Sequence, residues 1–168
     1  MIRLLLMPLA LVFATAGLSR GDEKYAPEGG KFTITFPGTA KPKESKQDVD
    51  TAVGKLQMSI ASVEVKKDLA LIVIYSDYPE ANAKPQEILA RARDGAKGAT
   101  GKLLEDKEIA LGKVPGRDFL LAKEESFYRA RMYLDGKRLY QVIVSGVKKD
   151  DVTSPGADKF LDSLELGK

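Results

Sequence analysis

The stretch SFYRARMYLDGKRLYQVIV, from Ser126 to Val144, decides the fold of this chain. Two alternating runs flank the dipeptide Asp135-Gly136, which is typical of a tight turn between antiparallel strands. The pattern predicts a β-hairpin in which Leu134 lies opposite Lys137, and Tyr133 lies opposite Arg138. Because alternate residues of a strand share a face, one face carries Phe127, Arg129, Arg131, Tyr133, Arg138, Tyr140 and Val144. The other carries Tyr128, Ala130, Met132, Leu134, Leu139, Gln141 and Ile143.

The second of these faces is the better core face, because Gln141 is its only strongly polar member. The first has two interpretations. The side chains could stack across the strands and pair with carboxylates such as Glu124 or Glu125, which is ordinary sheet construction. Alternatively, the face could be an open groove for an anionic or aromatic ligand, in which planar guanidinium groups bind the ligand. We call its candidate site residues the Arg–Tyr face: Arg129, Arg131, Tyr133, Arg138 and Tyr140.

The rest of the chain predicts more strands and two helices. Residues 32–36 alternate like a half-buried strand, residues 56–60 form a second alternation, and residues 38–48 are polar and loop-like. Residues 69–75 are almost continuously apolar, which predicts a central strand covered on both faces by helices. Further strands are expected around a turn at Gly112-Lys113.

Two helix starts can be read from proline positions. Pro85 opens a pattern whose apolar side holds Ile88, Leu89, Ala92 and Ala96. Near the end of the chain, Ser154 is a suitable N-cap for a short helix beginning at Pro155. The apolar stripe of this second helix is Ala157, Phe160, Leu161 and Leu164.

The first residues of the chain predict export. Arg3 precedes an apolar run that extends to Phe13, and Ala14 and Ala16 then match an A-x-A cleavage site. We expect a signal peptide over residues 1–16, a flexible leader over 17–30 and a single domain over 31–168. The alternative is an uncleaved N-terminal anchor, although the run is shorter than the ~20 residues that span a bilayer. The expected location is the periplasm or the medium.

Composition limits the chemistry that this protein can perform. The chain of 168 residues contains no cysteine and no histidine, which excludes thiol nucleophiles, Ser–His dyads and most zinc sites. Its formal net charge of +3 falls to +2 when Arg3 leaves with residues 1–16, so nothing indicates nucleic-acid binding. Lys148 to Asp151 and Asp158 supply oxygen atoms without the spacing of a calcium loop. We therefore expect no metal and no cofactor.

Several segments together resemble the PsbP-like superfamily. They are FTITFPG, GKVPGRDF, RARMYLDGKRLYQVIV and the closing FLDSLEL, and they extend over most of the chain after Lys31. The resemblance implies an α+β fold, an α/β/α sandwich with a central antiparallel sheet and helices packed on its faces. The plant member of the family assists a manganese cluster. That role is not carried over, because this chain has no histidine and no matching set of ligands.

These observations favour an exported, non-enzymatic binding or accessory module. It would dock an unknown protein partner or a small anionic ligand on a sheet face or at a loop edge. The alternatives are a hydrolase of the cell envelope that uses carboxylates alone, or a structural component of the envelope. The hydrolase would need two carboxylates about 5–10 Å apart in a cleft.

Overall fold

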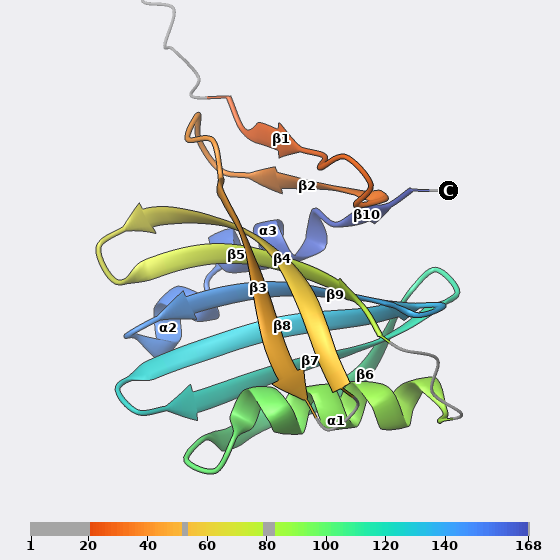
Figure 1. Ribbon diagram of the computed structural model, residues 1–168. Coiled ribbons are helices and arrows are strands. Elements are labelled where there is room, and N and C mark those ends of the chain that lie inside the picture. Colours follow the sequence, from red (N-terminus) through yellow and green to blue (C-terminus); the bar gives the residue numbers. More distant parts are fainter. Residues whose placement is uncertain (1–20, 52–53, 79–82, 168) are drawn as a thin grey trace, which may run out of the picture.

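The computed structural model describes residues 21–51, 54–78 and 83–167, and the expected signal peptide lies outside them. The described chain forms an α+β structure dominated by antiparallel sheet (Figure 1). The larger sheet has seven strands in the order β3-β4-β5-β9-β8-β7-β6. They are β3 (Lys43–Thr51), β4 (Gly54–Lys66), β5 (Leu69–Asp77), β6 (Lys102–Leu111), β7 (Val114–Lys123), β8 (Ser126–Asp135) and β9 (Arg138–Gly146).

A smaller sheet and three helices complete the described chain. The three-stranded sheet has the order β1-β2-β10, formed by β1 (Glu23–Tyr25), β2 (Phe32–Phe36) and β10 (Glu165–Leu166). Strand β1 therefore lies within the segment expected to be a flexible leader. The helices are α1 (Pro85–Lys97), α2 (Lys149–Val152) and α3 (Pro155–Asp162).

The two faces of the large sheet are covered differently. Helix α1 packs on one face through Leu89, which is fully buried against residues of β7, β8 and β9. The small sheet and α3 cover the other face, where Phe36 of β2 and Phe160 of α3 are in ring contact. Figure 1 shows α1 on one side of the sheet and the small sheet with α3 on the other. The layer over this second face is therefore partly β-strand, whereas the expected α/β/α sandwich had only helices there.

Both helix starts are confirmed. Helix α1 begins at Pro85, and Ser154 caps α3 by accepting a hydrogen bond from the backbone N–H of Ala157 at 3.2 Å. The two apolar stripes were wrong in one detail each. Ala96 is exposed, and Leu164, although buried, lies beyond the end of α3.

The central position predicted for residues 69–75 is confirmed, because β5 pairs with β4 on one side and β9 on the other. The cover expected on both faces was wrong, because Ile72 and Ile74 on one face are only half-buried. The turn at Gly112-Lys113 is also confirmed, because Leu111 pairs with Val114. The loop expected over residues 38–48 was wrong from Lys43 onward, since Lys43 begins strand β3 at the edge of the sheet. The side chains of this edge strand are mostly exposed and polar, so hydrophobic alternation could not reveal it.

The hairpin of β8 and β9 is present in a shifted register. Asp135 pairs with Arg138 and Tyr133 with Tyr140, so Gly136 and Lys137 form the turn instead of Asp135 and Gly136. Gly136 has φ of 59°, and a glycine in the first central position suits a type II′ turn. The shift is two residues, an even number, and therefore leaves every side chain on its predicted face.

Candidate functional site

The Arg–Tyr face is a paired network in the structure. Asp118 of β7 lies directly opposite Arg131 of β8, whose Nε donates to Asp118 Oδ2 at 3.1 Å. Arg129 donates to the same carboxylate at 3.3 and 3.4 Å. The side chain of Asp118 is only 5% exposed. The carboxylates expected from sequence, Glu124 and Glu125, are not the partners.

The same two arginines also reach helix α3. Arg129 Nη1 donates to Asp158 Oδ1 at 2.8 Å, and Arg131 Nη1 donates to Asp162 Oδ1. Each guanidinium therefore joins a strand carboxylate to a helix carboxylate. This arrangement holds α3 against the sheet and uses donors that a bound anion would require.

Electrostatics agree with this geometry. Burial alone would raise the pKa of the Asp118 carboxyl, but the hydrogen bonds and positive charges of Arg129 and Arg131 outweigh burial and lower that pKa. Burial would lower the pKa of each arginine, and the surrounding carboxylates reverse that effect and raise it. The group is consequently a network of full charges in the folded protein.

The other members of the Arg–Tyr face lie apart from this network. Arg138 donates to both carboxylate oxygens of Asp77, at 2.6 and 2.8 Å. Tyr140 is 2% exposed and donates its hydroxyl to the carbonyl of Gly30 at 3.2 Å. Tyr133 is 4% exposed. The structure therefore places the face mostly under the small sheet and α3, and its ligand-binding interpretation stays a prediction.

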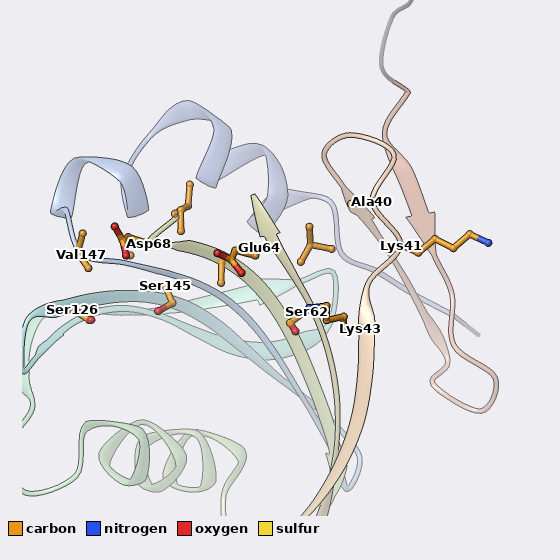
Figure 2. A pocket seen from close by; sticks show the side chains of 13 residues that line it. Ala40, Lys41, Lys43, Ser62, Glu64, Asp68, Ser126, Ser145 and Val147 are labelled. Atoms are coloured by element: carbon orange, nitrogen blue, oxygen red, sulfur yellow. The ribbon is translucent and has the colours of Figure 1, made fainter. Parts of the chain in front are cut away.

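A pocket of about 600 Å³ lies where β3 meets β4 and extends toward β9 and β8. We call it the serine pocket. Figure 2 shows Lys43 beside Ser62 in one part of it, and Ser126 and Ser145 in another. Its lining is Ala40, Lys41, Lys43, Ser62, Val63, Glu64, Asp68, Leu69, Ala70, Ser126, Ser145, Gly146 and Val147.

The polar side chains of the serine pocket have no partners among the residues that the structure describes. Within the described part of the chain, none of its seven charged or hydroxyl side chains forms a hydrogen bond or an ion pair with another residue. Val147, also in the lining, is 43% exposed although apolar. The arginines of the Arg–Tyr face are all paired, so the serine pocket offers more capacity to bind another molecule.

Sequence reasoning missed this pocket because its lining comes from five strands and three connections. The register places Lys43 directly opposite Ser62. The unexpected strand β3 supplies that lysine. Among the described residues no group of three or more acidic side chains could hold a metal ion.

Comparisons with known proteins support the fold. The solution structure of cyanobacterial PsbP (CyanoP) from Synechocystis sp. PCC 6803 is similar over 92% of this chain and 98% of that chain, with a TM-score of 0.55 and 14% identity. At this identity the likeness concerns the fold alone. This chain has a PsbP-like fold.

A second solved structure, the protein of unknown function PA94 from Pseudomonas aeruginosa, is more distant. It is 8% identical over 79% of this chain and 86% of that chain, with a TM-score of 0.41 that supports no argument. No family model and no curated protein matches the sequence. No helix among the described residues is long and apolar enough to cross a membrane.

Proposed function

We propose that this protein is an exported, non-enzymatic binding or accessory module that docks a protein partner or a ligand at the serine pocket. One observation carries the proposal: the polar side chains of the pocket have no intramolecular partners in the described chain. The PsbP-like fold supports an accessory role by analogy alone, since proteins of one fold perform different tasks. Residues 2–16 support export, since they have the pattern of a cleaved signal peptide.

The pocket suits binding better than catalysis. It combines hydroxyl groups, two lysines and two carboxylates with the apolar side chains of Val63, Leu69 and Val147. Recognition sites commonly combine an apolar lining with a few polar groups that fix orientation. Lys43 and Ser62 face each other across strands, yet Lys43 is exposed, whereas a lysine base is normally activated by burial.

The test reverses one charge in the pocket and one outside it. Lys43→Glu alters the pocket, and Lys46→Glu is the matched control on the opposite face of the same strand. Each full-length protein would be mixed with an envelope extract of the source cells, and bound components would be quantified by mass spectrometry. We expect the wild type and Lys46→Glu to retain the same component and Lys43→Glu to lose it. Equal retention by all three proteins would show that the partner docks elsewhere on the protein.

The carboxylate hydrolase remains a second candidate, because Glu64 and Asp68 both line the pocket. Hydrolysis of envelope glycan fragments by the wild type would be compared with that by Glu64→Gln and Asp68→Asn. Turnover that either substitution abolishes, without loss of folding, would establish the hydrolase and overturn the non-enzymatic proposal.

A further inference from the structure

The charged side chains of the serine pocket are separated by sign. Lys43 lies at one end of the pocket, directly opposite Ser62. Asp68 lies at the other end, where its backbone carbonyl accepts a hydrogen bond from the N–H of Val147 at 3.4 Å. Figure 2 shows these two ends, with Glu64 between them. The pocket therefore has a cationic end and an anionic end.

The register of the strands gives the spacing between the two ends. Ser62 pairs with Ile72 of β5, and Asp68 precedes Ile72 by four residues. At about 3.3 Å per residue, the two ends are about 13 Å apart along the strands. Glu64 lies about halfway, because it is two residues beyond Ser62 on the same face of β4. An extended peptide of about four residues has the same length.

Hydroxyl groups line the path between the two ends. Ser145 pairs with Ala70, which in turn pairs with Glu64, so Ser145 lies at the middle of the pocket. Figure 2 shows Ser126 toward the anionic end. A hydroxyl group can both donate and accept a hydrogen bond, so it suits the N–H and C=O groups of a peptide bond. Neither hydroxyl has a hydrogen-bond partner in the described part of the chain.

The pocket carries more negative than positive charge. Figure 2 shows Lys41 directed away from the rest of the lining, so Lys43 is the lysine that faces the two carboxylates of Glu64 and Asp68. A peptide with free ends brings one charge of each sign, which matches Lys43 and Asp68. The carboxylate of Glu64 then remains, and a basic side chain in the first half of the peptide would neutralise it.

We propose that the ligand of the serine pocket is an extended peptide of about four residues with free ends. Its C-terminal carboxylate binds Lys43 and Ser62, and its N-terminal ammonium group binds Asp68. A basic side chain at its second position pairs with Glu64. The inference rests on the proposed function and names the class of ligand that the pocket takes.

Isothermal titration calorimetry of the full chain with synthetic peptides tests the inference. The reference peptide is Ala-Lys-Ala-Ala with free ends. Three related peptides each change one feature: an acetylated N-terminus, an amidated C-terminus, or norleucine in place of lysine. We expect each change to weaken binding about tenfold, because each removes one charged hydrogen-bonding group. These comparisons use the wild-type protein, so a folding defect cannot produce the result.

Substitutions in the pocket then assign the two ends of the peptide. In Lys43→Gln, amidation of the peptide should cost no further affinity, and in Asp68→Asn, acetylation should cost none. Lys46→Gln is the matched control on the opposite face of β3, and it should bind all four peptides as the wild type does. Circular dichroism checks that each variant is folded.

Three results would overturn the inference. They are equal affinity of the wild type for all four peptides, no binding of the reference peptide at millimolar concentration, and equal losses in the control and the pocket variants. If no peptide binds while Lys43→Glu still loses its component from the envelope extract, the proposed function survives and only the class of ligand is wrong. If that component is retained as well, both fail.

Discussion

Asp118 and Arg131 face each other across β7 and β8, with Arg131 Nε 3.1 Å from Asp118 Oδ2. Arg129 shares the same carboxylate, and both arginines extend to carboxylates of α3. One buried carboxylate therefore organises the contact between the large sheet and the C-terminal helix.

Asp118→Asn is expected to lower the free energy of unfolding by about 3 kcal/mol, because it removes one partner from a buried ion network. Urea denaturation at neutral pH measures this loss. Asp50→Asn is the control, since Asp50 is exposed on β3, and surface changes cost at most about 0.5 kcal/mol. A loss no larger than that of the control would show that the network contributes little stability.

Stability is expected to decrease in acid partly through Asp118. Its pKa in the folded protein is lower than the value of about 3.9 for an unfolded chain. The stabilisation is thus complete above that value and is lost as the pH falls through the folded pKa. Between about pH 5 and pH 2, the free energy of unfolding of the wild type should fall more steeply than that of Asp118→Asn. Parallel curves would contradict this assignment.

Two glycines should respond to alanine in opposite directions. A Cβ on Gly116 would lie 2.6 Å from the carbonyl oxygen of Met132 and 2.6 Å from the ring of Tyr133, so Gly116→Ala should destabilise by about 1–3 kcal/mol. Gly95 lies within α1, and a Cβ there meets nothing within 4 Å. Gly95→Ala should therefore stabilise by about 0.5–1 kcal/mol. Thermal unfolding of both variants tests the pair, and a shift in the same direction would refute the prediction.

Ser154→Ala is expected to cost about 1 kcal/mol, because Ser154 caps the first turn of α3. Ser45→Ala on the exposed edge strand is the matched control. Denaturant unfolding compares the two. Equal stability would mean that the ion pairs of α3, and not its cap, fix the start of the helix.

The mature protein is expected to begin at Gly17. Expression of the full chain in the source organism, followed by intact-mass measurement of the exported protein, gives the cleavage point directly. Ala16→Leu should retain the precursor, because the residue before the cleavage point must be small. Recovery of uncleaved wild-type protein in the membrane fraction would instead support an anchor.

Local chemistry made the helix starts and hairpin faces predictable. Pro85 and Ser154 mark helix starts through interactions within a few residues, which a sequence displays directly. Which face a side chain of β8 or β9 occupies depends only on whether a register shift is an even or an odd number of residues. The predicted faces were therefore correct, although the register was shifted by two residues.

Features that depend on distant segments were not predictable in the same way. The partners of Arg129 and Arg131 are Asp118 of β7 and two carboxylates of α3, instead of Glu124 and Glu125. Strand β3 is held by backbone pairing with β4 and has too few apolar side chains to produce a hydrophobic pattern. The serine pocket depends on this pairing of β3 with β4, because the pairing brings Lys43 to its lining.

Strand β2 receives its neighbours from opposite ends of the described chain, β1 on one side and β10 on the other. During synthesis, β10 leaves the ribosome long after β2, so this part of the core is completed only when nearly all of the polypeptide is available. Contacts so distant in sequence form slowly. The export that we propose fits this arrangement, because a chain whose core is completed late can pass through a translocation channel while it is still extended.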